Sequence, residues 1–264
     1  MAEKLGLLKE YLASLESVAV AFSGGVDSTF LLKVAHDVLG DKAIAVTISS
    51  SLIPERELEE AKKFCSENKI KQIICNVDEL EIEGFKNNPP NSCYLCKKNL
   101  FAKILSIAKQ NNLANVIEGS NVDDLGDYRP GLKAIEELEI KSPLKVAELH
   151  KSEIRTLSKE LNLKTWNKPS FACLASRFVY GETISKEKLK MVEKSEELLM
   201  NLGFNQFRVR VHGKIARIEI LPKDFLKLIE LREKIYEALK NFGFSYVTLD
   251  LQGYRTGSMN ETLK

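Results

Sequence analysis

The run Val18-Ala19-Val20-Ala21-Phe22 and the loop SGGVDS that follows it at 23–28 decide the fold. The apolar run is as short and continuous as a buried strand, and the loop after it is polar and rich in glycine. Beyond the loop, apolar residues recur at helical spacing until Gly40, which is a typical helix stop: Phe30, Leu31, Val34, Val38 and Leu39. The stretch predicts a strand–loop–helix unit.

The same alternation of strands and helices continues along the chain. Further strands are predicted over 43–48, 71–77 and 115–118, with one helix opening at Pro54 and another over 97–109. Buried strands that alternate with helices favour an α/β fold with a parallel, doubly wound sheet. Because ligands collect at the carboxyl ends of such strands, we expect the site there.

The pattern changes beyond Gly181. The spacing predicts helices over 185–201 and 226–242 and strands over 207–211, 215–221 and 246–251. The first two strands alternate and are joined by a short turn, which indicates an antiparallel pair. We therefore expect an α/β domain over residues 1–180 and a smaller α+β domain over 181–264.

Composition restricts the class of protein. The 264 residues are 44% hydrophobic and 29% charged, which excludes extensive disorder. The net charge of +2 gives no strong field for nucleic acid, so we expect no such partner. No apolar run reaches the roughly 18 residues that span a bilayer, and the first residues lack a secretory apolar core. Five cysteines, an odd number, argue against a disulfide framework. We expect a cytoplasmic protein with no membrane partner.

The glycine loop has the chemistry of a phosphate site. Gly24 and Gly25 let backbone N–H groups approach an anion at a helix N-terminus, and the Asp27 carboxylate suits a Mg²⁺ ion beside the phosphates. The Walker pattern is absent, because no lysine follows the glycines. The alternative is a glycine turn that only permits tight packing of strand against helix.

Three cysteines lie outside the predicted core. Cys93 and Cys96 follow a proline-rich loop, and Cys173 lies in a second irregular stretch. A zinc site would need a fourth ligand, a redox pair would leave Cys173 unused, and a 4Fe–4S cluster on three cysteines leaves one iron open. Three buried thiols are the remaining alternative. Cys65 and Cys75 are expected in the core.

The loop resembles that of the ATP pyrophosphatase (PP-loop) superfamily, whose pattern is S-G-G-x-D-S. The resemblance implies that the chain cleaves ATP between the α- and β-phosphates and adenylates an acceptor. It also implies the ATP-binding residues, with Mg²⁺ at Asp27: Ser23, Gly24, Gly25, Asp27, Ser28, Thr47, Asn121 and Arg129.

Four longer motifs resemble the LarE-type sulfur transferases: GSNVDDLGDYRPG at 119–131, WNKPSFACLASR at 166–177, RVRVHG with ARIE at 208–219, and GYRTGS at 253–258. That family converts carboxylates of a pyridine mononucleotide to thiocarboxylates for a nickel-pincer cofactor. Some members sacrifice the sulfur of a single cysteine at the position of Cys173. The extra Cys93 and Cys96 resemble the branch that holds a 4Fe–4S cluster.

This resemblance implies the remaining roles. It assigns the cluster to Cys93, Cys96 and Cys173, catalysis to Cys173, Asp27 and Arg177, and substrate contacts to Asp124, Arg129, Arg210 and Glu219. It also implies a sulfide donor and a homo-oligomer. From the residue pattern alone, Arg208, Arg210 and Glu219 would instead form a solvated, ion-paired strand face.

Three other functions fit part of the pattern. A tRNA thiolase also combines a PP-loop with a three-cysteine cluster, but it needs a basic RNA surface. An amidating PP-loop enzyme would leave Cys93 and Cys96 without a role. The third is a non-enzymatic sensor that binds ATP and a cluster.

Overall fold

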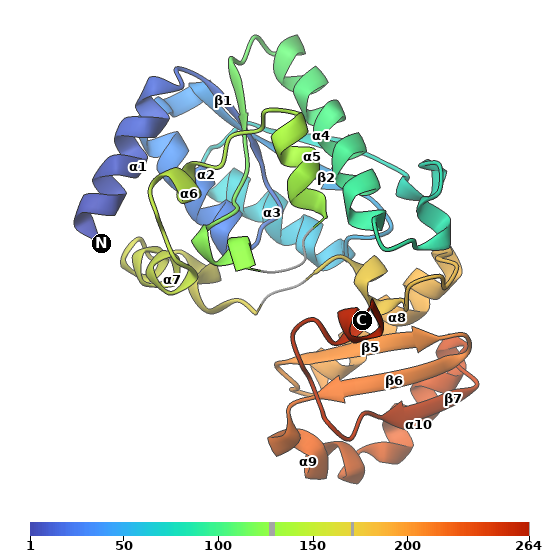
Figure 1. The fold of residues 1–264 in the computed structure, drawn as a ribbon. Coiled ribbons are helices and arrows are strands. Elements are labelled where there is room, and N and C mark those ends of the chain that lie inside the picture. Colours follow the sequence, from blue (N-terminus) through green and yellow to red (C-terminus); the bar gives the residue numbers. More distant parts are fainter. Residues whose placement is uncertain (127–129, 170–171, 264) are drawn as a thin grey trace. The chain divides into compact units, whose positions relative to one another are not determined.

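The structure is a computed structural model that describes residues 1–126, 130–169 and 172–263 (Figure 1). The chain divides into two compact units. The first comprises Met1–Val77 and Cys93–Phe171, and the second comprises Asp78–Ser92 and Ala172–Lys264. Each unit is described by itself below. The division groups Asp78–Ser92 with the later residues, and the predicted domain boundary at residue 180 stays a prediction.

The first unit is built on a parallel sheet of four strands, and this confirms the predicted α/β class. The strands are β1 (Val18–Ala21), β2 (Ala43–Ser49), β3 (Gln72–Asn76) and β4 (Asn115–Ile117), in the order β3-β2-β1-β4. The register aligns Val18 with Ala43 on one side and with Asn115 on the other.

Helices cover both faces of this sheet (Figure 1). They are α1 (Ala2–Ser14), α2 (Val26–Leu39), α3 (Glu55–Glu67), α4 (Ser92–Gln110), α5 (Gly131–Glu137), α6 (Pro143–Val146) and α7 (Lys151–Glu160). Alternate β1 residues face two cores: Val18 and Val20 pack with apolar residues of α1, α2, α3 and α7, and Ala19 with those of α4 and α5. Period-2 alternation between two buried faces is the physical reason that β1 and β2 read as continuous apolar runs.

The strand order creates a topological switch point between β1 and β4. The chain moves from β1 to β2 and β3 on one side, and then returns to β4 on the other side of β1. Loops after β1 and β4 therefore diverge at the carboxyl edge, which leaves room for a ligand between them. The loops in question hold residues 22–25 and 118–121.

The second unit contains a three-stranded mixed sheet. Strand β5 (Phe207–His212) pairs antiparallel with β6 (Ile215–Ile220), which pairs parallel with β7 (Tyr246–Leu249). The helices are α8 (Lys186–Asn201), α9 (Phe225–Glu230) and α10 (Arg232–Phe242). The single helix predicted over 226–242 is wrong in one respect: it is divided at Leu231, which ends α9 and precedes α10.

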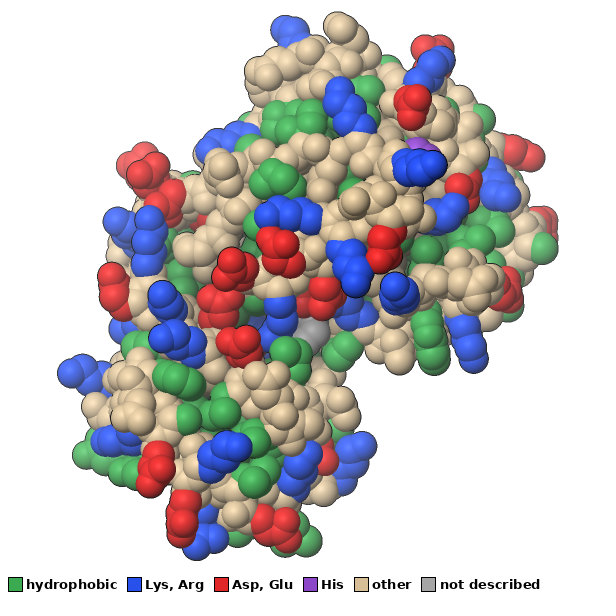
Figure 2. Space-filling model, turned by 180° about the vertical axis from the view of Figure 1, so that it is seen from behind, with side chains coloured by type: hydrophobic (Ala, Val, Ile, Leu, Met, Phe, Trp, Pro, Cys, Tyr) green, Lys and Arg blue, Asp and Glu red, His purple; other side chains and the backbone are tan. Residues whose placement is uncertain are grey.

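The distribution of charge on the surface agrees with the near-zero net charge. Basic and acidic side chains are interspersed over the face drawn in Figure 2. No helix within the described ranges combines the length and the apolar character that crossing a membrane requires.

Candidate active site

The loop after β1 has the backbone geometry of an anion cradle. Gly24 has a φ of +71°, which a side chain would strain, and a Cβ there would lie 3.4 Å from the Ala61 Cβ of α3. The Ser28 hydroxyl donates to the Gly25 carbonyl at 3.3 Å and lies 3.1 Å from the Ser23 hydroxyl. The loop is therefore closed on itself by its own serines.

Helix α2 starts at this loop and points its N-terminus into it. Its N-cap is Gly25, which has no side chain to cap the first turn. A 14-residue helix concentrates partial positive charge on those N–H groups. The loop after β4 approaches closely, because a Cβ on Gly119 would lie only 3.1 Å from the Ser28 nitrogen. Both loops therefore meet at the switch point.

A lysine that the sequence analysis did not single out supplies a cation at this loop. Lys151, the first residue of α7, forms an ion pair with the Asp27 carboxylate. The other Asp27 oxygen lies 3.4 Å from the side-chain amide nitrogen of Asn121. Nothing in the local sequence indicates that the helix beginning at Lys151 would face Asp27.

Hydrogen bonds within the loop after β4 hold its side chains. The Asn121 N–H donates to the Asp124 carboxylate at 2.9 Å, and the Asn121 side-chain oxygen accepts from the Asp123 N–H at 3.0 Å. Asp123 also accepts from the Lys151 N–H at 2.7 Å and lies 2.7 Å from a ring nitrogen of His150. The His150 hydrogen bond and then that N–H lower the pKa of Asp123. Predicted residues Asn121 and Asp124 thus lie in one hydrogen-bonded loop beside Asp27.

Two predicted ATP-binding residues remain, of which one is described by the structure. Thr47 is buried within β2, and its hydroxyl accepts a hydrogen bond from the Gln72 side chain at 2.8 Å. Arg129 lies outside the described residues, so its predicted role stays a prediction.

The five cysteines range from buried to exposed. Cys65 is buried on α3, where burial raises its pKa to about 12, and Cys75 lies partly buried in β3. Cys93 and Cys173 are exposed, and Cys96 is intermediate. The alternative of three buried thiols is therefore wrong for Cys93 and Cys173.

The possible cluster ligands lie in both units. Cys93 and Cys96 occupy the start of α4, which begins earlier than predicted, whereas Cys173 belongs to the second unit. Among the residues that the structure describes, no three His, Cys, Asp or Glu side chains form a group that could hold a metal ion. Their joint role stays a prediction.

Arg177 holds the backbone around Cys173. The Arg177 side chain is 1% exposed and bonds both oxygens of Glu196, at 2.9 and 2.7 Å. Its remaining terminal nitrogen donates to the carbonyls of Ala172 and Cys173 at 2.6 and 3.1 Å. Desolvation raises the pKa of the Cys173 thiol, although the side chain is exposed, and the charge of Arg177 opposes this.

A buried charge network lies on the second sheet. Arg210 bonds Glu219 at 2.8 Å and the Ser258 hydroxyl at 2.9 Å, and Arg217 bonds the other Glu219 oxygen at 2.9 Å. Glu219 is 0% exposed, and Arg208 and Arg210 are each 5% exposed. The alternative of a solvated strand face is therefore wrong. Burial and the charge of Arg177 lower the pKa of Arg208 to about 10.

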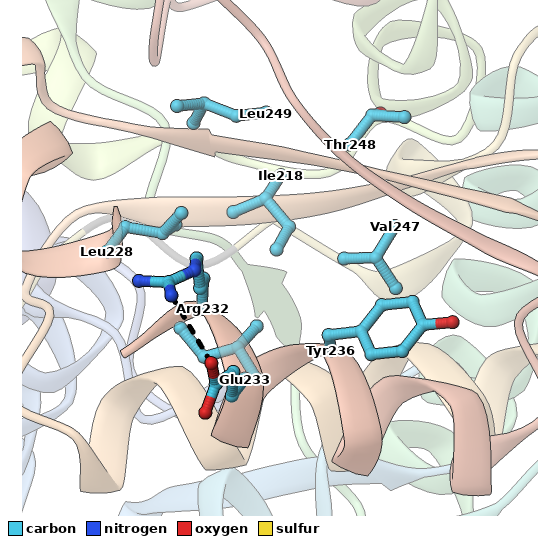
Figure 3. Close-up of a pocket in the computed structure, with 9 residues that line it drawn as sticks. Ile218, Leu228, Arg232, Glu233, Tyr236, Val247, Thr248 and Leu249 are labelled. Carbon is cyan, nitrogen blue, oxygen red and sulfur yellow. Dashed lines mark hydrogen bonds and ion pairs between the residues drawn. The ribbon is translucent and has the colours of Figure 1, made fainter. Parts of the chain in front are cut away.

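One hollow of the second unit has about 410 Å³ and no predicted site residue in its lining. Figure 3 shows Ile218 of β6 and Val247 of β7 above Tyr236 of α10, with the Arg232–Glu233 ion pair, 3.2 Å long, at one side. Its walls are mainly apolar and carry no phosphate-binding loop. The predicted phosphate-binding loop lies instead in the first unit, after β1.

Comparison with known proteins agrees with that geometry. Residues 2–177 match the NAD synthase family. An uncharacterised protein of Synechocystis sp. is 42% identical over 100% of this chain and 99% of its own. The pyridinium-3,5-bisthiocarboxylic acid mononucleotide synthase of Lactiplantibacillus plantarum is 40% identical over 100% of this chain and 96% of its own. An uncharacterised protein of Methanocaldococcus jannaschii is 34% identical over 91% and 92%. The chain therefore belongs to the NAD synthase family of PP-loop proteins and, within it, to the LarE-type group.

Proposed function

We propose that this protein is an ATP-dependent sulfur transferase. It adenylates the carboxylates of a pyridine dicarboxylic acid mononucleotide and converts them to thiocarboxylates in the synthesis of a nickel-pincer cofactor. The observation that carries the proposal is the SGGVDS loop at the switch point between β1 and β4, in a chain similar over its full length to a synthase of that product.

The residues of the loop take part in the first step. A substrate carboxylate attacks the α-phosphate of ATP, and pyrophosphate leaves toward the N-terminus of α2. The N–H groups of Gly24 and Gly25, the hydroxyls of Ser23 and Ser28, and the Lys151 ammonium group stabilise the negative charge that collects there. Holding substrate and phosphate in line supplies the rest of the rate enhancement.

The donor set at Asp27 suits magnesium. Mg²⁺ prefers carboxylate oxygens together with phosphate oxygens, and Asp27 presents a carboxylate at the mouth of the loop. Asp27 would hold the Mg²⁺ that accompanies ATP, and the Lys151 ammonium group, which pairs with Asp27 here, would then contact the phosphates. Thr47, Asn121 and Arg129 complete the proposed nucleotide site.

Three cysteines form the proposed cluster site. Thiolate sulfur is the ligand that iron–sulfur clusters require, and Cys93, Cys96 and Cys173 are the cysteines outside the cores. These three thiolates would hold a 4Fe–4S cluster, which would supply an iron able to bind the sulfide for transfer. Arg177 fixes the Cys173 loop and counteracts the rise in the pKa of that thiol.

The proposed substrate contacts come from both units. Asp124 and Arg129 belong to the first, and Arg210 and Glu219 to the second. Arg210 and Glu219 form a buried pair, so Glu219 fixes the orientation of the Arg210 guanidinium for an anionic substrate. A sulfide donor, a homo-oligomer, a cytoplasmic location and the absence of a nucleic-acid partner complete the proposal.

The test is an anaerobic assay of the iron-reconstituted protein with ATP, Mg²⁺, sulfide and the pyridine dicarboxylate mononucleotide. We expect pyrophosphate and AMP to form only when the mononucleotide is present, and mass spectrometry to detect sulfur in place of carboxylate oxygen. More than one sulfur transferred per chain would exclude sacrifice of Cys173.

Other outcomes would identify a different function. Pyrophosphate release that needs tRNA would indicate a tRNA thiolase, and release that needs ammonia would indicate an amidating enzyme. If the protein binds ATP but releases no pyrophosphate with any acceptor, the result would indicate the non-enzymatic sensor.

A further inference from the structure

We propose that Lys168 is a positioning residue that fixes the orientation of the Gly24–Gly25 peptide in the ATP loop. The inference rests on the proposed ATP-binding function of that loop. It concerns a lysine far along the sequence, in a stretch with no regular strand.

The ammonium group of Lys168 has three acceptors around it. It donates to the Gly24 carbonyl at 3.2 Å and lies 2.7 Å from Glu57 and 2.6 Å from Glu60, both on α3. A lysine has three N–H donors, so these acceptors match its full capacity. The side chains of Lys168 and Glu57 are 12% and 9% exposed, so this pair is shielded from water, whereas Glu60 is 57% exposed.

Without the contact to Lys168, the Gly24–Gly25 peptide plane could rotate easily. Two consecutive glycines have no Cβ to oppose a change of φ and ψ, and Gly24 already has a φ of +71°. A peptide plane can then rotate, which exchanges the directions of its C=O and N–H groups. A loop built on two glycines therefore needs an external contact to select one orientation.

The contact to the Gly24 carbonyl selects the orientation that favours an anion. In a planar trans peptide the C=O of Gly24 and the N–H of Gly25 point in opposite directions. Because Lys168 holds the carbonyl toward α3, the Gly25 N–H points away from α3, into the loop. The reversed peptide would turn a carbonyl oxygen toward the phosphates and repel them.

The backbone of Lys168 is itself held in place. Arg155 of α7 donates to the Trp166 carbonyl at 2.6 Å and to the Lys168 carbonyl at 2.9 Å. The lysine is thus anchored at its backbone by α7 and at its ammonium group by α3. These contacts at both ends of the residue fix the position of the Lys168 side chain.

Labelling can observe this one peptide. Gly24–Gly25 is the only pair of adjacent glycines among the 264 residues. Protein that carries carbonyl-¹³C glycine and ¹⁵N glycine therefore gives a single signal in an HNCO spectrum, that of the Gly25 N–H. We compare the full-length chain with Lys168→Met, Lys168→Arg and Lys62→Met. Lys62 pairs with Glu59 on the exposed face of α3 and serves as the matched control.

Without ligand, we expect Lys168→Met to shift or broaden the signal, while Lys168→Arg and Lys62→Met keep it near its wild-type position. By calorimetry, we expect Lys168→Met to weaken inorganic pyrophosphate binding about tenfold, as the loss of one oriented donor predicts. In turnover, the KM for ATP rises more than kcat falls.

An unchanged signal and unchanged pyrophosphate affinity in folded Lys168→Met would overturn the inference. If wild-type protein bound neither ATP nor pyrophosphate, the proposed function would fail, and the ligand-free spectra would still decide whether Lys168 orients the peptide.

Discussion

The ammonium group of Lys151 pairs with the carboxylate of Asp27, 124 positions away in the sequence. One residue is the first of α7 and the other lies in the first turn of α2, so the pair joins two helix N-termini at one point. The Ser23–Ser28 loop has no lysine, and Lys151 of α7 supplies a positive charge beside it.

Replacement of this lysine tests its role in phosphate binding. We expect Lys151→Met to lower kcat for pyrophosphate formation about a hundredfold, because the variant lacks the positive charge that stabilises the negatively charged leaving group. Steady-state pyrophosphate release measures the change. Lys33→Met is the control, since Lys33 pairs with Asp37 on the outer part of α2. Equal rates for Lys151→Met and wild type would contradict the assignment.

The close approach of Gly119 to α2 leads to a second prediction. A Cβ at Gly119 would lie 3.1 Å from the Ser28 nitrogen, and adjacent backbone leaves it no room. Gly119→Ala should cost about 1–3 kcal/mol of unfolding free energy and raise the KM for ATP. Gly6→Ala on α1 has open space and should instead stabilise by about 0.5–1 kcal/mol. Urea denaturation of both variants decides.

The buried pair of Arg177 and Glu196 leads to a third prediction. Glu196→Gln leaves the Arg177 charge without its countercharge, and this should lower the unfolding free energy by about 3–5 kcal/mol. Glu233, the exposed partner of Arg232, offers a control. Glu233→Gln should change the unfolding free energy by less than about 0.5 kcal/mol. A small loss of unfolding free energy in Glu196→Gln would contradict the stabilising role assigned to this pair.

The same carboxylate should make stability depend on acidity. Burial raises the pKa of Glu196, but the charge and hydrogen bonds of Arg177 outweigh this and hold the pKa below the ordinary 4.5. A depressed pKa stabilises the fold above pH 4.5, and that contribution is lost as the pH falls through the folded-state value. Melting temperatures of Glu196→Gln should therefore fall less steeply below pH 4.5 than those of wild type. Parallel curves would disprove the linkage.

Iron content tests the cysteines. After anaerobic reconstitution we expect about four iron atoms per wild-type chain and a large loss in Cys93→Ser, Cys96→Ser and Cys173→Ser. Cys75→Ser should keep its iron, because this residue lies inside β3. Iron measured by colorimetric assay and absorbance spectra gives the answer. Retention of full iron by any of the three predicted ligand variants would remove that cysteine from the proposed set.

Local sequence patterns predicted the parallel sheet and the Ser23–Ser28 loop correctly, because strand, glycine and helix signals there are contiguous. Lys151 and Lys168 escaped prediction because their partners are Asp27 and Gly24, and no local pattern indicates a contact over such a separation. Each became visible only when the loops were folded together.

The buried network on β5 and β6 shows the same limit. Arg208 and Arg210 alternate with apolar residues, a pattern that also describes a half-exposed strand. Arg210 is covered instead by groups from distant segments, namely the Ser176 carbonyl and the Ser258 hydroxyl. Whether a polar strand face is exposed to solvent or buried depends on such distant segments, and the alternation of residues along the strand does not predict their position.

The excursion of Asp78–Ser92 into the second unit has a consequence for dissection of the protein. Asn88 donates to the carbonyls of Phe178 and Val179, and its own carbonyl accepts from the Gly181 N–H at 3.0 Å. The chain therefore passes from one unit to the other at three places, not one. A cut near residue 180 would separate Asn88 from Gly181 and Asp78–Ser92 from most of the second unit. The later fragment would then lack a part of its own unit, and the earlier fragment would carry segments of the second unit without the rest.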